Sequence, residues 1–160
     1  MEFEPDEINL TGFDQLVNAV GSKNPPVARL GILSKDVART EGESTNSEIG
    51  AAHEYGSIKR GLPSRSFLRM PLNDVFHGEL DNTDLLSEDV FKDVIKSGKL
   101  TPWLTQCAIL AVATIKKAFA SNGFGKWAPW KPGYENNTGD ILVDTRQLRD
   151  RISYDIKDGD

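Results

Sequence analysis

Apolar residues recur at helical spacing in three stretches of the chain, over residues 14–20, 87–96 and 101–120. The first two carry apolar side chains mainly on one face, and a glycine follows each within two residues, as is typical of a helix end. The third begins with Thr101 and Pro102, a good N-cap and first-turn pair, and its interior is apolar nearly all round. The pattern therefore predicts two amphipathic helices and one long helix that forms the centre of the core.

Two further stretches are typical of strands. Residues 27–36 are rich in aliphatic and β-branched side chains, and the stretch is too short and too interrupted by glycine for a helix. Residues 151–156 alternate apolar and polar positions, as a half-buried strand does. We expect these two stretches to supply a small antiparallel sheet.

The polar stretch over residues 37–47 is rich in small side chains and predicts a loop. Asn46 or Ser47 can cap the short helix that follows, and Gly56 ends it.

A turn over residues 57–64 leads into another predicted helix. Ser64 or Ser66 can cap this helix, which runs through apolar positions to Phe76. Pro71 is compatible with it only if the helix starts nearby, because proline is tolerated in the first turn.

Residues 126–140 contain two tryptophans, two prolines and several turn residues, and they predict a second long loop. Residues 1–8 predict a loose acidic end. Neither an internal repeat nor a domain boundary is present, so we expect one domain over residues 1–160. The expected fold class is α+β, with a small antiparallel sheet packed against one long helix and several short helices.

Charge and composition make some classes of function less favourable for this chain than others. The net charge is −5, from 19 basic and 24 acidic residues, which disfavours a regulatory nucleic-acid-binding module. A local basic cluster, Lys59 and Arg60 with Arg65 and Arg69, could still bind phosphate, although such clusters are more often solvated or paired with acids. The chain lacks both a run of about eighteen apolar residues and a signal-peptide pattern, so we expect a soluble protein without membrane contact. The single cysteine, Cys107, lies in an apolar run and is expected to be buried.

The pair His53 and Glu54 is the strongest candidate for chemistry. A zinc protease would require a second histidine four residues after the first, but Ser57 stands there. Cys-x-x-Cys, phosphate-loop and Gly-x-Ser-x-Gly patterns are absent, so we expect neither a metal nor a cofactor. The structural interpretation is that the end of the helix, through Tyr55, ties down the following turn. The catalytic alternative is a small nuclease or hydrolase that uses His53 and Glu54.

Two longer motifs carry a resemblance to a known family. The run "LGILSKDVARTEGESTNSEIGAAHEYGSIKRGLPSRSFLRMPL" and the run "WAPWKPGYENNTGDILVDTRQLRDRISYDI" resemble the two signatures of the tail-completion proteins of long-tailed double-stranded DNA phages, also described as minor tail or virion-morphogenesis proteins. The first signature reads A-x-x-H-E-F/Y-G and then I-P-A/S-R-S/P-F-L-R, and the second reads W-x-P-L and then L-I-D-T-G-Q-L-R-x-S-I-x-Y. The chain departs from the family at Arg146, where glycine is usual, and at Trp130, where leucine is common.

The resemblance implies that the matching residues are architectural. Gly56 and Pro63 would bracket a turn, Arg65 and Arg69 would donate to carboxylates such as Glu54, and Phe67 would enter the core. The full set of matching positions is His53, Glu54, Tyr55, Gly56, Pro63, Arg65, Phe67, Leu68, Arg69, Asp144, Thr145, Leu148 and Arg149.

The resemblance also implies a structural virion protein without catalysis, assembled in the host bacterial cytoplasm. It would form a homo-oligomeric ring of about six or twelve subunits at the neck or upper end of the tail, completing the tail and joining it to the head. Its other partners would be neighbouring neck, connector and tail-tube or tail-terminator proteins, with DNA only as cargo in the channel. Candidate interface residues lie in the two long loops: Glu43, Thr45, Trp127, Trp130 and Lys131. For the two tryptophans, burial in the core is an equally good interpretation.

Overall fold

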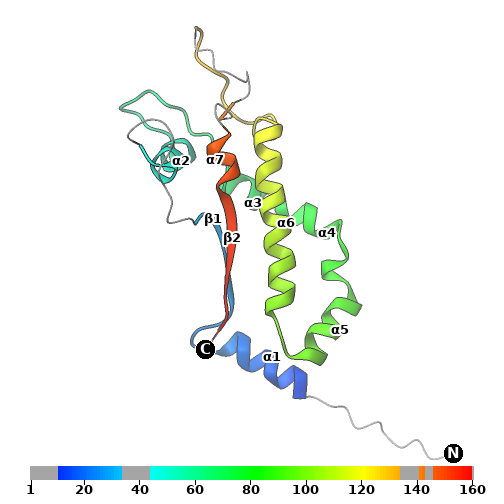
Figure 1. Cartoon of the computed structure of the whole chain (residues 1–160). Coiled ribbons are helices and arrows are strands. Elements are labelled where there is room, and N and C mark those ends of the chain that lie inside the picture. Colours follow the sequence, from blue (N-terminus) through cyan, green and yellow to red (C-terminus); the bar gives the residue numbers. More distant parts are fainter. Residues whose placement is uncertain (1–10, 34–43, 134–140, 143–145, 160) are drawn as a thin grey trace, which may run out of the picture.

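The computed structural model describes residues 11–33, 44–133, 141–142 and 146–159. Within them the fold is α+β, as expected from the sequence. Helix α6 (Thr101–Ala120) lies centrally, with a two-stranded sheet on one side and short helices on the other (Figure 1).

The sheet pairs β1 (Val27–Ile32) with β2 (Ile152–Lys157) in antiparallel register, with the first residue of β1 opposite the last residue of β2. Both predicted strands are confirmed, although β1 ends at Ile32, and residues 34–36 of the prediction lie outside the described chain. Arg29 and Asp155 form a salt bridge across the two strands. A sheet of two strands is marginal in water on its own, and here α6 packs against both strands.

Helix α6 has the predicted bounds, but its N-cap is Leu100 rather than Thr101. Thr101 is instead the first helical residue, and its hydroxyl donates to a carboxylate oxygen of Asp158 at 2.8 Å. This hydrogen bond ties the start of α6 to the chain just after β2. The buried residues of α6 all lie beyond its second turn: Ala108, Ala111, Thr114, Ile115, Ala118 and Phe119.

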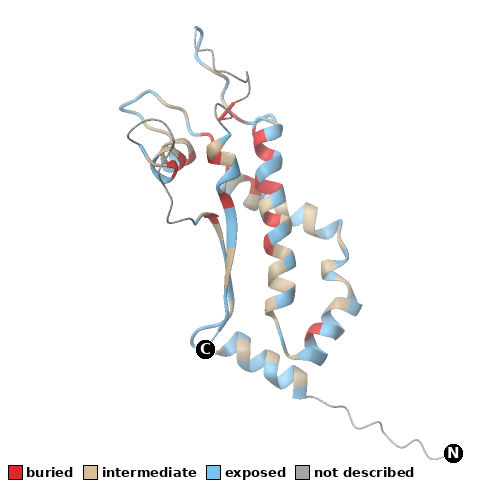
Figure 2. Ribbon diagram, in the orientation of Figure 1, coloured by how far each residue is buried: buried red, intermediate tan, exposed pale blue. Residues whose placement is uncertain are grey.

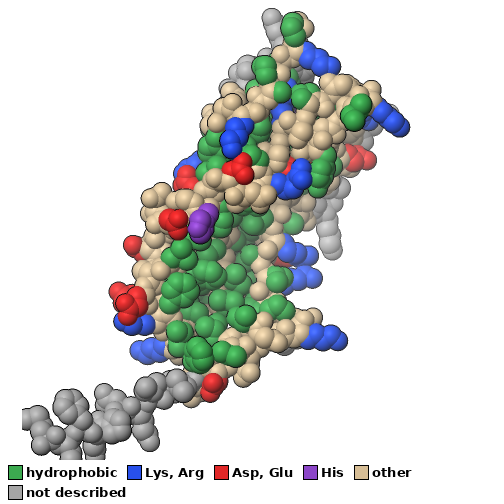
Figure 3. Space-filling view, turned by 180° about the vertical axis from the view of Figure 1, so that it is seen from behind, with side chains coloured by type: hydrophobic (Ala, Val, Ile, Leu, Met, Phe, Trp, Pro, Cys, Tyr) green, Lys and Arg blue, Asp and Glu red, His purple; other side chains and the backbone are tan. Residues whose placement is uncertain are grey.

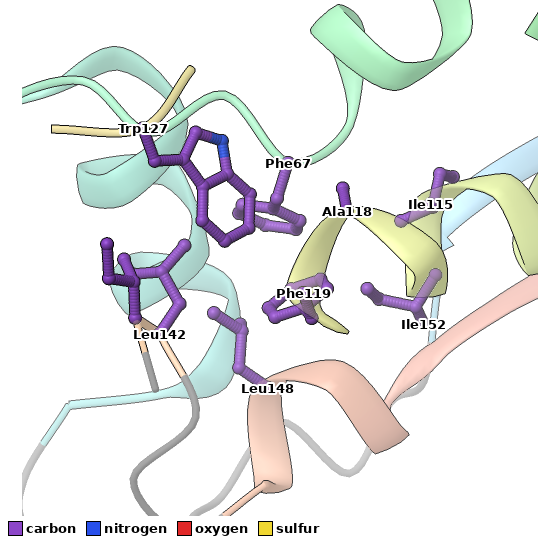
Figure 4. Packing of buried hydrophobic residues seen from close by; sticks show 9 residues of the cluster. Phe67, Ile115, Ala118, Phe119, Trp127, Leu142, Leu148 and Ile152 are labelled. Carbon is purple, nitrogen blue, oxygen red and sulfur yellow. The ribbon is translucent and has the colours of Figure 1, made fainter. Parts of the chain in front are cut away.

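The hydrophobic core gathers at the C-terminal end of α6 (Figures 2 and 4). Phe67 is 0% exposed and its ring centroid lies 5.4 Å from that of Phe119, which in turn meets Trp127 edge-on at 5.6 Å. The cluster as a whole comprises Phe67, Ile115, Ala118, Phe119, Trp127, Ile141, Leu142, Leu148 and Ile152. The half of the molecule that holds α1 (Thr11–Gly21) and α5 (Glu88–Ser97) is far less buried (Figure 2).

Helices α1 and α5 confirm the predictions for residues 14–20 and 87–96 to within three residues at each end. Ser87 caps α5, and Gly98 ends it in the left-handed conformation. The two helices approach closely at Gly12, where an added Cβ would lie 1.8 Å from the carbonyl oxygen of Ile95. A glycine at this position is therefore what allows α1 to lie on α5.

Helix α2 (Asn46–Tyr55) starts differently from the prediction, both in its N-cap residue and in where the preceding loop ends. Thr45 is the N-cap, and it forms a capping box with Glu48, in which the hydroxyl accepts from the Glu48 amide and the Glu48 carboxylate accepts from the Thr45 amide. Neither Asn46 nor Ser47 caps the helix, because both already have helical geometry. Residues 37–43 of the predicted loop lie outside the described chain, and its predicted end at residue 47 is wrong because α2 already begins at Asn46.

The helix predicted from Ser64 or Ser66 to Phe76 is wrong in its start and in its continuity. The chain forms α3 (Arg69–Asp74) and α4 (Phe76–Asp81), separated at Val75, whose φ of −124° departs from helical geometry. Pro71 lies in the first turn of α3, as its ring requires. The 3₁₀ helix η1 (Asp84–Leu86) and the four-residue helix α7 (Gln147–Asp150) complete the described elements.

Phe67→Ala should lower the free energy of unfolding by about 3–5 kcal/mol, because a fully buried aromatic side chain leaves a cavity in the core. Phe13→Ala removes the same ring from a site that is 45% exposed, and it should lower the free energy by less than about 1 kcal/mol. Urea unfolding of both variants measures the difference. Equal losses would contradict the assignment of the core.

Candidate functional site

Residues 34–43 of the first motif lie outside the described chain, and the polar contacts of the rest gather at the end of α2. Gly56 has φ 76°, and an added Cβ there would lie 2.8 Å from the amide nitrogen of Ser64, so a glycine is required for the chain to turn. Ser57 and Leu62 then exchange two backbone hydrogen bonds of 2.9 Å, which closes the predicted turn. The amide of Arg65 donates to the carbonyl of His53 at 2.7 Å and brings the returning chain against the end of α2.

Glu54 is the centre of this motif. Its carboxylate accepts five hydrogen bonds of 2.6 to 3.2 Å, and its side chain is only 5% exposed. The donors are the Ser66 hydroxyl, the amides of Phe67, Leu68 and Arg69, and the Nε of Arg69. The amide of the next residue, Met70, donates to the Ser66 hydroxyl at 3.0 Å.

These bonds explain why α3 starts at Arg69 and not earlier. The first amides of a helix have no partner within it, and here the carboxylate of Glu54 accepts that of Arg69, the first residue of α3, together with the two amides that precede it. Burial raises the pKa of Glu54, but hydrogen bonds from Ser66, Leu68 and Arg69 outweigh it, so the net shift is downward. The carboxylate is therefore ionised at neutral pH.

The two arginines of the motif have different partners. Arg69 contacts Glu54 as expected, with 3.0 Å between Nε and Oε1, and its guanidinium carbon lies 4.6 Å from the ring centroid of Tyr55. Arg65 does not donate to Glu54 as predicted. It is 2% exposed, and its Nε and Nη2 donate to the carbonyls of Ala128 and Pro129 at 2.9 and 3.0 Å. The reason is that its guanidinium group reaches the backbone of the loop that holds Trp127 and Trp130, which we call the tryptophan loop.

That loop reaches the core through its two tryptophans. Trp127 is 7% exposed, and its indole donates to the carbonyl of Ser66 at 3.2 Å. Of the two interpretations that the sequence left open for Trp127, core and interface, the structure has it in the core, because its ring packs against Phe119. Trp130 lies under Arg65, with 4.7 Å from the guanidinium carbon to the ring centroid, and Lys131 is exposed.

The second motif lies partly in the described chain. Leu148 is buried in the core, while Arg149 pairs with Asp150 at 2.9 Å near the surface. Arg146 has φ 62° and ψ −5°, so it adopts a left-handed conformation although it is not a glycine.

Of the remaining sequence-predicted residues, three lie outside the described chain: Glu43, Asp144 and Thr145. Thr45 is the cap of α2, and Pro63 and Leu68 are half-buried. In the described part of the chain, groups of three or more His, Cys, Asp or Glu side chains placed to hold a metal do not occur. The described helices also include none with the length and apolarity to cross a membrane.

A cavity of about 470 Å³ lies beside this motif and was not predicted from the sequence. It is lined by His53, by apolar side chains from α2, the turn and α7, and by four cationic residues, Arg60, Arg65, Lys131 and Arg146. Desolvation, and then the charge of Arg65, lower the pKa of His53 to about 4, and its buried Nδ1 has no hydrogen-bond partner among the described residues. This arrangement can hold an anionic group with an apolar part.

Glu54→Ala should lower the free energy of unfolding by about 3–5 kcal/mol, because it leaves three buried or half-buried amides and the Arg69 side chain without their acceptor. Glu88→Ala removes an exposed carboxylate that pairs with Lys92, and it should change the free energy by less than about 0.5 kcal/mol. Chemical denaturation compares them. If both variants were equally stable, Glu54 would not organise the motif.

His53 should make the fold less stable in mild acid. Its pKa falls from the ordinary histidine value of 6.5, which applies to the unfolded chain, to about 4 in the folded chain, so the unfolded state takes up a proton first as the pH falls. The free energy of unfolding should therefore decrease between about pH 6.5 and pH 4, and His53→Gln should remove that part of the decrease. His77→Gln, at a side chain that is 83% exposed, is the matched control and should not remove this decrease. Unfolding curves at several pH values test this, and an identical profile for His53→Gln and the wild type would contradict it.

Comparison of the chain with protein-family models, with curated protein sequences and with solved structures finds no match. The resemblance to tail-completion proteins therefore rests on the two sequence motifs, and the function that it implies is a proposal.

Proposed function

We propose that this chain is a structural subunit of the virion of a long-tailed bacteriophage. It assembles with copies of itself into a ring at the neck or upper end of the tail, completes the tail and joins it to the head. Its neighbours there are connector, neck and tail-tube or tail-terminator proteins, and DNA passes through the ring as cargo. The ring forms in the host bacterial cytoplasm, and the role needs no cofactor.

An uncovered apolar surface carries this proposal. In α1 the side chains of Phe13, Val17 and Val20 follow helical spacing and are 45%, 51% and 56% exposed, and no residue of this helix is buried. Phe91 and Ile95, one turn apart on the adjacent α5, are also exposed. We call these five residues the apolar face. Figure 3 shows hydrophobic side chains forming a continuous area over this half of the molecule.

Such a surface is unusual for a protein that acts alone. Monomeric proteins rarely expose large contiguous apolar areas, and those that do commonly use them to bind other proteins. The apolar face is also separated from the compact core at the other end of α6 (Figure 2). A subunit of an assembly buries such a surface against its neighbours, and a ring does so when the contacts are heterologous and the rotation closes.

The use of Glu54 supports an architectural role over a small nuclease or hydrolase that uses His53 and Glu54. A general base needs a free lone pair that faces the substrate. Both carboxylate oxygens of Glu54 already accept at least two hydrogen bonds from the protein's own chain. Burial of the His53 imidazole, and then the charge of Arg65, lower its pKa, so it is a weak acceptor for a proton.

Particles made with a Val17→Glu chain should show heads and tails that are not joined, because a charge in the apolar face opposes its burial between subunits. The substituted site is half exposed, so the isolated chain should keep its free energy of unfolding within about 1 kcal/mol. Asn18→Glu adds the same charge at the next, polar position of α1 and should leave joining intact. Electron microscopy of particles complemented with each variant, or made without the protein, provides the measurement. Intact, tailed particles in the absence of the protein would refute the proposed function.

A further inference from the structure

The cavity beside α2 has a distinct chemistry. Its four cationic side chains come from the turn after α2, from the tryptophan loop and from the start of α7, and the described residues that line it include no Asp or Glu. Between the cationic residues lie apolar ones: Ile49, Leu62, Trp130, Leu142 and Leu148. We call this site the basic cavity. It presents positive charge around an apolar floor.

A described carboxylate close to Arg60, that of Glu48, already has partners within its own helix turn. Glu48 and Arg60 both line a neighbouring pocket. The pKa of Glu48 is lowered mainly by its hydrogen bonds with Thr45, and to a smaller extent by the charge of Arg60. The capping box holds this carboxylate at the start of α2. Among its described lining residues the basic cavity therefore presents four cationic side chains and no carboxylate, a pattern that a carboxylate-bearing partner would complement.

The chain itself contains a segment with the complementary pattern. Residues 1–10, "MEFEPDEINL", hold four acidic residues and no Lys or Arg, interleaved with Phe3, Ile8 and Leu10. This segment lies outside the described residues and immediately precedes α1. Its alternating acidic and apolar side chains suit a site with a cationic rim and an apolar floor.

We infer that the basic cavity of one copy binds segment 1–10 of a neighbouring copy. The carboxylates of the segment pair with the guanidinium groups of Arg60 and Arg146 and with Lys131, and its apolar side chains lie on the floor beside Trp130. Arg65 holds Trp130 in place through the contact of its guanidinium group with the indole ring. The inference rests on the self-assembly in the proposed function and names one of its contacts.

The shape of the molecule favours the neighbour's segment over the chain's own. Helix α1 lies near the start of α6, whereas α2 and α7, which line the basic cavity, lie at the other end of α6 (Figure 1). A helix of 20 residues spans about 30 Å, and ten fully extended residues reach at most about 33–36 Å. The chain's own segment would use nearly its whole length to cover this distance and would leave too few residues to occupy the cavity. A head-to-tail neighbour brings the segment directly to it.

A synthetic peptide of residues 1–10 with a fluorescent label tests the binding chemistry. Fluorescence anisotropy should show saturable binding to the full-length chain that weakens as salt is raised. Arg60→Glu with Lys131→Glu should weaken this binding by about tenfold or more. Lys23→Glu with Lys116→Glu makes the same change in net charge outside the cavity and should alter it by less than about twofold.

Two results would overturn the inference at this step. One is equal affinity of the peptide for the cavity variant and for the matched control. The other is tighter binding of a short oligonucleotide than of the peptide at this cavity, which would make it a phosphate site. Circular dichroism of both double variants ensures that a loss of binding is not a loss of fold.

A charge exchange between full-length chains tests whether the segment comes from a neighbour. One chain carries the cavity changes Arg60→Glu and Lys131→Glu with the natural segment. The other carries the natural cavity and the segment changes Glu2→Lys, Glu4→Lys, Asp6→Lys and Glu7→Lys. Each alone should associate weakly in sedimentation velocity, and the mixture should recover the association of the wild type. The inference would be overturned if the mixture did not recover association but a single chain that carries both sets of changes did. That result would show that the segment binds the cavity of its own chain.

The two proposals fail in different ways. If a chain without segment 1–10 still joins heads to tails and self-associates as the wild type does, the inference is wrong and the proposed function stands. If the peptide binds the basic cavity but particles without the protein are intact, the proposed function is wrong although the contact exists.

Discussion

The buried carboxylate of Glu54 is the interaction on which the rest of this structure depends. A carboxylate loses its hydration when buried, and it remains ionised only if the protein supplies enough donors. Five donors from residues 66–69 do so, and in return the carboxylate fixes the backbone that leads into α3. Phe67 lies in the middle of that fixed stretch, so the same set of bonds directs its ring into the core. The end of α2, the turn and the start of α3 are thereby one unit.

Arg65 and Trp127 extend this unit to the second motif. Arg65 donates to carbonyls 63 and 64 residues further along the chain, and Trp127 donates back to the carbonyl of Ser66. The side chains that make these bonds are buried, where a hydrogen bond is stronger and an unpaired polar group is more unfavourable than in water. The two motifs that resemble the tail-completion family are therefore in direct contact, which explains why both are needed to build one core.

The placement of this core leaves the molecule with two different ends. Near the C-terminal end of α6 the side chains are closely packed, and the basic cavity opens beside them. Near its start, α1 and α5 approach closely through Gly12 but keep their apolar face exposed. Unlike surfaces at the two ends of a subunit suit head-to-tail contacts between copies, in which different patches meet. The cationic residues of the cavity add positive charge at the first of these ends.

The sequence by itself determined the elements whose signals are local. The long helix over residues 101–120, the helix ended by Gly98 and both strands follow from periodicity and end signals within a few residues. Tertiary structure decided the start of α3, the partners of Arg65, the burial of Trp127 and the existence of the basic cavity. The hydrogen bonds that set the start of α3, the partners of Arg65 and the position of Trp127 join groups that are between 12 and 64 residues apart in the chain. No local pattern encodes such contacts, because they exist only after the Glu54 carboxylate and the core have brought the segments together.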